Sequence, residues 1–318
     1  MEGSLRLYSD LALQYLRWPP SARPRARILC VHGWVDNCAT FANLAPQLAS
    51  QLSADVVALD LAGHGRSDHR TTSSNYSILA YAHDLVLALD ALEASLWTGE
   101  AVPTVLVGHS MGGGLCTVLA GSYPDRFSAL VLIDNIGLSA RPAADAPAIF
   151  RNAVASLRAG GASLSAGAPA AGPPTPYASV EDAVQQRLKT VTLHPGAQSL
   201  SHAAAELLVR RALVEVPAAS SGDAAQYRFG HDRRIVGPSL LFAVEDHARA
   251  FLAAVRCPTL VVRAINGWPL ADDVREARLA ALGARLSYVS LPGSHHLHLD
   301  ADTAPAVCRT VVEFVAIT

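Results

Sequence analysis

The sequence predicts an α/β protein, with a mostly parallel central sheet flanked by helices and a mainly helical insertion after the sixth strand. Strand-sized apolar runs alternate with segments of helical periodicity. Most of these runs are apolar throughout, as in parallel strands buried on both faces. The third observation is a change of composition after Asp134. The chain has 318 residues, of which 51% are hydrophobic, and this is enough for a sizeable core.

The first 136 residues are expected to form the N-terminal part of the core. Residues 5–18 alternate in polarity and predict a β-hairpin. Residues 77–95 repeat leucine at helical spacing and predict a helix. The remaining predicted strands are Arg27–Val31, Val56–Leu61, Val102–Val107 and Ala129–Ile133.

Residues 137–255 are expected to form a cap or lid. Within them, residues 159–176 consist almost entirely of Ala, Gly, Ser and Pro, which predicts a low-complexity loop. An insertion at this point would cover the carboxyl ends of the strands, where open α/β sheets bind ligands. The predicted cap helices are 146–157, 180–191, 200–214 and 238–255.

The α/β rhythm resumes in residues 256–318, which are expected to complete the core. Strands are predicted at Thr259–Ala264 and Leu286–Leu291, and helices at Val274–Leu282 and Ala304–Ala316.

Charge and cysteine usage exclude several classes of function. The formal net charge is −2, so no basic field is available to attract nucleic acid. No apolar run reaches the length of a membrane span, and no signal peptide is expected at the polar N-terminus. We therefore expect a cytoplasmic protein without cofactor or metal that binds a small-molecule substrate. Its cysteines are odd in number and form no CxxC pair, which indicates reduced thiols: Cys30, Cys38, Cys116, Cys257 and Cys308.

The strongest chemical signal is Gly108-His109-Ser110-Met111-Gly112-Gly113. This GxSxG pattern follows an apolar strand and opens a helix, which is the context that a nucleophile elbow needs. A serine in such a turn has strained backbone angles, so its neighbours must lack side chains. We therefore predict that Ser110 is a nucleophile.

A nucleophilic serine needs a general base. The segment after the last predicted strand contains three histidines before the last helix. We choose His295, because a loop that follows this strand directly can bend over the elbow. His296 and His298 are the competitors.

The acid that would orient this base has two candidates. Asp134 stands at the end of the strand Ala129–Ile133, whereas Asp272 follows the strand Thr259–Ala264 after a longer loop. Either choice keeps the chain order Ser, Asp, His. Asp272 could equally cap the helix after it. Asp134 is preferred.

The oxyanion hole should take one N–H from the residue after the nucleophile, Met111, and one from the loop after the first central strand, for which we choose Trp34. We expect His32, Gly33 and His109 to border the bound substrate. A second glycine-rich stretch, from Asp60 to Ser67, is predicted to be a structural turn, and its His64 is not expected to take part in catalysis.

These stretches together resemble the α/β-hydrolase superfamily, and more narrowly the serine hydrolase-like proteins. The narrower resemblance rests on His32-Gly33-Trp34-Val35-Asp36-Asn37, Gly230-His231-Asp232-Arg233-Arg234 and Pro292-Gly293-Ser294-His295. It implies a lidded hydrolase. Superfamily members usually carry the acid in a turn after the penultimate strand, but here that place reads Arg263-Ala264-Ile265-Asn266-Gly267-Trp268, without a carboxylate. This departure shifts weight to Asp134.

The function expected from these residues is hydrolysis of an ester or related acyl bond through an acyl-enzyme. Two alternatives stay open: carbon–carbon bond hydrolysis or cofactor-free haloperoxidation on the same triad, and a non-catalytic ligand-binding protein of this fold. Aromatic residues of the insertion suggest an apolar substrate. The possible pocket walls are Phe150, Tyr177, Tyr227, Phe229 and Phe242.

Overall fold

An eight-stranded sheet organises the molecule in the computed structural model, which describes residues 1–8, 10–99, 101–158, 176–216, 225–237 and 239–317. The strands lie in the order β1-β2-β4-β3-β5-β6-β9-β10. Their bounds are β1 Glu2–Tyr8, β2 Leu11–Trp18, β3 Ala26–Val31, β4 Ala54–Leu59, β5 Thr104–His109, β6 Ala129–Ile133, β9 Thr259–Asn266 and β10 Leu286–Ser294. The predicted α/β architecture is confirmed.

The six strands from β4 to β10 run parallel, so their carboxyl ends meet at one edge of the sheet. The strand β2 runs antiparallel to both of its neighbours, β1, with which it forms the predicted hairpin, and β4. Because sequential apolar residues alternate between the two faces, β3 contributes Ile28 and Cys30 to one core cluster and Leu29 and Val31 to the other.

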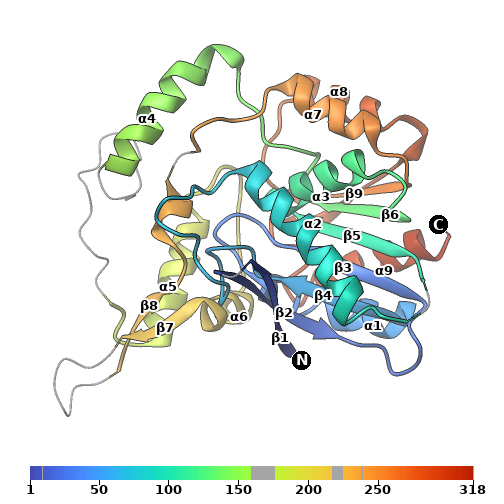
Figure 1. The fold of residues 1–318 in the computed structure, drawn as a ribbon, viewed down its shortest axis with the longest axis horizontal. Coiled ribbons are helices and arrows are strands. Elements are labelled where there is room, and N and C mark those ends of the chain that lie inside the picture. The colour runs from blue at the N-terminus through green and yellow to red at the C-terminus, as the bar shows by residue number, and fades with distance from the viewer. Residues whose placement is uncertain (9, 100, 159–175, 217–224, 238, 318) are drawn as a thin grey trace.

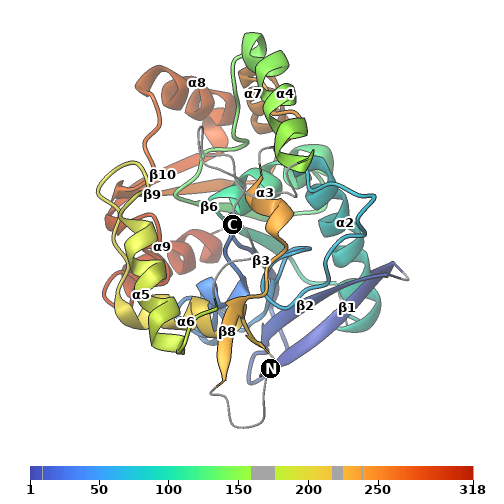
Figure 2. The same cartoon turned by 90° about the vertical axis from the view of Figure 1, so that its left-hand side faces the viewer.

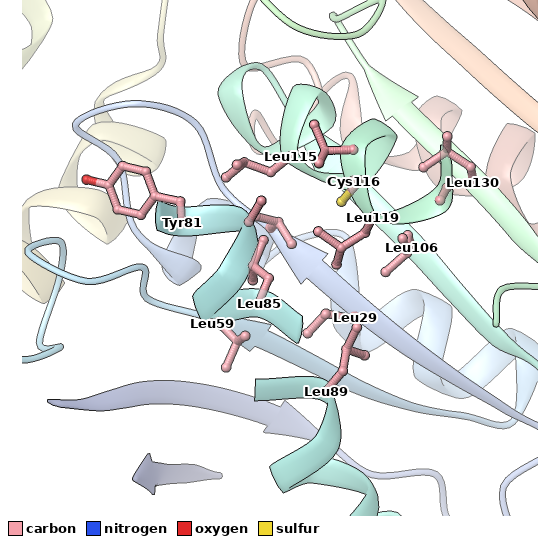
Figure 3. Close-up of a cluster of buried hydrophobic side chains, with 14 of the residues drawn as sticks. Leu29, Leu59, Tyr81, Leu85, Leu89, Leu106, Leu115, Cys116, Leu119 and Leu130 are labelled. Atoms are coloured by element: carbon pink, nitrogen blue, oxygen red, sulfur yellow. The ribbon is translucent and has the colours of Figure 1, made fainter. Parts of the chain in front are cut away.

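Helices cover both faces of the sheet (Figure 1). One face carries α2 (Ile78–Ser95), α3 (Met111–Ser122), α7 (Glu245–Ala254) and α8 (Asp272–Leu282), and the other carries α1 (Ala45–Leu52) and α9 (Ala304–Ala316). Figure 3 shows the first of these cores, where leucines of α2 and α3 pack over β3, β4 and β5. Burial of apolar surface on both faces keeps the strand ends in fixed positions.

The segment between β6 and α7 leaves the sheet. It contains α4 (Ala146–Arg158), α5 (Val180–Val191), α6 (His202–Ala212) and a small antiparallel sheet of β7 (Leu213–Val216) and β8 (Gln226–Phe229). We call α5, α6, β7 and β8 the cap; it has its own apolar cluster around Val184, Ala205 and Leu208. Figure 2, turned to face this side, shows these elements in front of the sheet.

The structure differs from two of the helices predicted in the insertion. Residues 200–214 form a shorter helix and then enter β7, because Leu213 to Val216 pair with β8. In residues 238–255 only α7 is helical, and it packs on α3 and α8 of the core through Ala248 and Leu252. Much of the low-complexity stretch 159–176 lies outside the described residues.

A buried ion pair joins the cap to the core. Arg211 of α6 donates to both carboxylate oxygens of Asp60, at the end of β4, and the side chains are 6% and 0% exposed. The same carboxylate accepts the backbone N–H groups of Cys38 and Arg66. Asp60 therefore has a structural role, as predicted from its place in the turn.

A second contact joins the segment 230–236 to the core loop after β4. The Tyr76 hydroxyl donates to Asp232 at 2.8 Å, and the Asp232 N–H donates to the Gly63 carbonyl at 2.9 Å. Arg234 donates to the carbonyls of Thr71 and Ser74. The Gly-His-Asp-Arg-Arg stretch noted in the sequence is thus a docking segment between cap and core.

Two further observations concern the cysteines and the helices. All five cysteines are buried and free, so the chain forms no disulfide. Among the described residues, no helix is long and apolar enough to cross a membrane.

Candidate active site

The elbow places Ser110 between β5 and α3. Its backbone has φ 52° and ψ −122°, a conformation that L-residues rarely adopt. The flanking glycines allow this turn: a Cβ on Gly108 would overlap the backbone of Gly112, and a Cβ on Gly112 would overlap the Val31 carbonyl. The strain holds the serine side chain at the sheet edge, next to the first turn of α3.

The structure brings His295 and Asp134 together. His295 follows β10 directly, and its Nδ1 lies 2.5 Å from Oδ2 of Asp134, which follows β6. Since a carboxylate can only accept, the Nδ1–H of His295 donates this bond. Asp134 is fully buried at its side chain, and the His295 side chain is 12% exposed. The bond fixes the imidazole orientation and leaves Nε2 without a proton in the neutral form.

The other candidates for base and acid lie elsewhere. Asp272 is an exposed residue in the first turn of α8 and pairs with Arg275 at 2.6 Å. His296 Nε2 lies 3.4 Å from Asp36 Oδ2, and His298 Nε2 lies 3.0 Å from Thr40 Oγ1. Among described residues, Asp134 is therefore the candidate acid that contacts a candidate base.

The end of β9 and the residues just after it, which lack a carboxylate, hold the Asp134 side chain. The Ala264 N–H donates to Oδ1 at 3.2 Å and the Trp268 N–H to Oδ2 at 2.8 Å. Arg263 Nη1 lies 2.8 Å from Oδ1. Gly267 faces the carboxylate so closely that a Cβ at this position would overlap it.

These contacts decide the charge of Asp134. Burial raises its pKa, but the hydrogen bond and charge of His295, the charge of Arg263 and the Trp268 N–H lower it further, so the pKa lies below the ordinary 3.8. The carboxylate is therefore ionised at neutral pH. It can stabilise a proton on His295.

The loop after β3 approaches the serine closely at Gly33. A Cβ on Gly33 would lie 3.1 Å from Ser110 Cβ and 3.2 Å from His109 Nδ1, so a side chain here would crowd the elbow. Among the described residues, neither the Trp34 N–H nor the Met111 N–H has a hydrogen-bond acceptor. The Trp34 side chain is half exposed and its Nε1 donates to the Ile235 carbonyl.

His32 and His109, which were expected to border the substrate, are both buried. Nδ1–H of His32 donates to the Gly33 carbonyl and Nε2 accepts from the Leu61 N–H. His109 Nε2–H donates to the His295 carbonyl at 2.9 Å. Both side chains therefore support the loops around Ser110, and their contact with a substrate stays a prediction.

Two residues of the connection before α6, which the sequence patterns do not single out, hold the loop that carries the base. Gln198 Oε1 accepts the His295 N–H at 3.0 Å, and the Ser199 carbonyl accepts the Ser294 hydroxyl at 2.5 Å. The sequence does not predict that Gln198 and Ser199 hold this loop, because they approach His295 only in the folded chain.

Comparison with known proteins agrees with this geometry. The model of the family described as the alpha/beta hydrolase fold matches residues 26–207, more than half of the chain. The chain belongs to the α/β-hydrolase family. The matched region includes the elbow, the loop after β3 and Asp134.

Relatives within the α/β-hydrolase family include a serine hydrolase-like protein from Dictyostelium discoideum, 25% identical over 99% of this chain and 81% of that protein. A crystal structure of a hypothetical protein from Pseudomonas aeruginosa is similar at a TM-score of 0.79, with 32% identity and 99% of both chains covered. A rat monoglyceride lipase is 32% identical over 123 residues, covering 38% of this chain and 39% of the lipase. The resemblance inferred from the motifs is confirmed.

Proposed function

We propose that this α/β-hydrolase cleaves an ester or related acyl bond through an acyl-enzyme on Ser110. The observation that carries the proposal is the 2.5 Å hydrogen bond between His295 Nδ1 and Asp134. A base oriented by a buried carboxylate, on a loop that contacts His109, the residue before the strained serine, fits nucleophilic serine catalysis. A protein that kept only the fold would have no need to keep a buried Asp–His pair, so the geometry argues against the non-catalytic alternative.

The reaction follows from the roles of these groups. His295 Nε2 takes the proton of the Ser110 hydroxyl as its oxygen attacks the substrate carbonyl. The negative charge that develops on the carbonyl oxygen is held by the Trp34 and Met111 N–H groups. His295 then protonates the leaving alcohol, and the acyl-enzyme forms. A water molecule, deprotonated by the same histidine, releases the acyl group and restores Ser110.

The substrate class follows from the surfaces near the base. The Trp268 ring lies 5.5 Å from the His295 ring, centroid to centroid. Trp34 adds a second, half-exposed aromatic surface on the loop after β3. Together with the similarity to a monoglyceride lipase over part of the chain, these surfaces favour an apolar acyl or aryl group.

The aromatic residues expected to line the pocket have other surroundings. Phe150 is exposed on α4. Tyr177 and Phe229 pack edge to face inside the cap. Phe242 lies beneath Arg141, whose guanidinium carbon is 5.5 Å from the ring centroid. The tryptophans therefore replace them as the proposed contacts for the apolar part of the substrate.

A fluorophosphonate probe tests the nucleophile. We expect stoichiometric labelling of the wild-type chain and no labelling of Ser110→Ala, with a Ser128→Ala variant labelled as the wild type. Hydrolysis of p-nitrophenyl esters of graded acyl length should depend on the same serine. Equal labelling of wild type and Ser110→Ala would disprove the proposal.

A further inference from the structure

Three potential metal ligands meet behind the elbow. Asp36 of the loop after β3, His109 at the end of β5 and His296 of the loop after β10 each contribute one atom, and these atoms lie within 4.8 Å of one another. His296 Nε2 is 3.4 Å and His109 Nδ1 is 3.8 Å from Asp36 Oδ2. All three residues are buried.

The polar atoms of this cluster are short of partners. Asp36 Oδ1 accepts the Asn37 N–H, but the buried Oδ2 has no hydrogen-bond partner among the described residues, and neither does His109 Nδ1. Buried polar atoms are nearly always hydrogen-bonded, so two such atoms facing each other need a physical explanation.

The tautomer of His109 shows why these two atoms cannot be partners of each other. Its Nε2–H donates to the His295 carbonyl, so in the neutral ring Nδ1 carries a lone pair. That lone pair faces the unpartnered oxygen of an ionised carboxylate. Two acceptors opposed in this way repel each other unless a cation lies between them.

We propose that Asp36, His109 and His296 form a binding site for a divalent transition-metal ion of the zinc type. Two imidazole nitrogens and one carboxylate oxygen are a ligand set that suits zinc, whereas magnesium and calcium prefer oxygen ligands alone. In a tetrahedral zinc site the ligand atoms are about 3.3 Å apart. Two of the three separations, 3.4 and 3.8 Å, lie within about half an ångström of this value, and the third is no longer than 4.8 Å.

The ligands flank the proposed catalytic groups in sequence. His109 precedes Ser110, and His296 follows His295. An ion held by both would tie the elbow to the loop of the base, and Asp36 would add the loop that carries Trp34. The site would therefore act as a clamp on the catalytic loops, without contact between the ion and the substrate.

Arg187 of α5 is the other positive charge that acts on this cluster. Burial raises the pKa of Asp36, but the nearby His296 and, after it, the charge of Arg187 bring it below its usual range. Among the described residues, Arg187 forms no ion pair with Asp36.

Metal titration tests the site without reference to catalysis. The untagged full chain, stripped with a chelator, is titrated with Zn²⁺ against a colorimetric zinc indicator. We expect one equivalent to bind tightly and an excess of Mg²⁺ not to compete. Bound Zn²⁺ should raise the Tm by roughly 5 °C at a hundredfold excess over its Kd.

Variants locate the ion. Asp36→Asn, which keeps the size of the side chain, should weaken Zn²⁺ binding by roughly 100-fold or more and abolish the rise in Tm. Asp134→Asn should bind Zn²⁺ as the wild type does, so a failed catalytic proposal leaves this test intact. His202→Gln, on the surface of α6, controls for adventitious binding to an exposed histidine.

Co²⁺ provides a readout that needs no variant. A four-coordinate site with nitrogen and oxygen ligands should give intense visible d–d bands in the wild-type chain, displaced by one equivalent of Zn²⁺. The proposal fails if the wild type binds no Zn²⁺, if Asp36→Asn binds it equally well, or if binding is lost in His202→Gln.

Discussion

At the scale of single residues, the position of the acid defines this site. Asp134 accepts from the side chain of His295 and from the backbone N–H groups of Ala264 in β9 and Trp268 after it, and Arg263 balances its charge. A carboxylate with this many donors cannot turn away from the imidazole without leaving some of them unpaired. The orientation of His295 is therefore enforced by residues that take no part in the reaction themselves.

Replacing Asp134 tests this orientation. Asp134→Asn should lower kcat/KM for an ester substrate by roughly 10³- to 10⁴-fold, because an amide cannot impose the same tautomer on His295. Asp272→Asn is the matched control and should keep wild-type activity, since Asp272 is exposed and paired with Arg275. Steady-state kinetics on both variants is the measurement. A larger loss in Asp272→Asn would assign the acid to that residue.

Gly267 offers a second test at this scale. A methyl group at this position would overlap the Asp134 carboxylate, so Gly267→Ala should displace it, reduce activity, and cost about 1–3 kcal/mol of stability. Gly99→Ala is the control, because a Cβ there meets nothing within 4 Å. Urea denaturation and ester hydrolysis check both effects. Retention of full activity in Gly267→Ala would show that the carboxylate is less confined than the contacts indicate.

At the scale of elements, the cap is bound to the core at several places. The ion pair between α6 and the end of β4 is buried, and the segment 230–236 docks on the loop before α2. The connection before α6 adds Gln198, which holds the base loop. The connection between α5 and α6 therefore helps to position the loop that carries His295.

Replacing Arg211 tests the buried ion pair with Asp60, and replacing the neighbouring Arg210 is the control. Arg211→Met leaves the Asp60 carboxylate buried without its charged partner, and we expect a loss of about 3 kcal/mol in the free energy of unfolding. Arg210→Met removes only an exposed pair with Glu206, and should change stability by less than about 1 kcal/mol. Denaturant titration of the two variants provides the comparison. Similar losses in both would mean that the buried pair does not anchor the cap.

At the scale of the whole molecule, stability should depend on pH through carboxylates held between elements. Burial raises the pKa of Asp232, but its hydrogen bonds with Arg234 and Tyr76 lower it further, so the folded value is below 3.8. The unfolded chain therefore takes up this proton first as the pH falls. The contribution of Asp232 is present above about pH 4 and is lost as the pH falls through its folded pKa.

A difference measurement isolates this contribution. Asp232→Asn should be less stable than the wild type by about 1 kcal/mol at pH 7, and the gap should close as the pH falls below 3.8. Asp246→Asn, at a side chain that is 82% exposed, should show no such gap at any pH. Thermal melts across the pH range decide between them. A gap that widens in acid would contradict the lowered pKa.

Sequence patterns predict most of the core and two members of the candidate triad. The elbow is local, because glycine spacing and an apolar strand determine it. His295 could be predicted as the base because it follows the last strand directly. The preference for Asp134 over Asp272 came from its place directly at the end of a predicted strand, and the structure supplies the hydrogen bond that supports it.

The remaining parts could not be read from the sequence for a physical reason. Gln198, Arg263 and Asp36 act on residues far away in the chain, and no periodicity or spacing encodes such contacts. The same holds for β7 and β8, whose pairing is non-local, so that Leu213 and Val214 looked like the end of a helix. Tertiary context decides these assignments.

The end of β9 and the residues after it surround the Asp134 carboxylate. This arrangement has a consequence for where the acid can stand in the sequence of a protein with this fold. The strands β6 and β9 are neighbours, so a carboxyl group carried by either can occupy the same volume. A carboxylate at the end of β9 would therefore reach the same imidazole that Asp134 contacts in this chain. The acid can thus stand at different positions in the sequence and still occupy the same position beside the histidine.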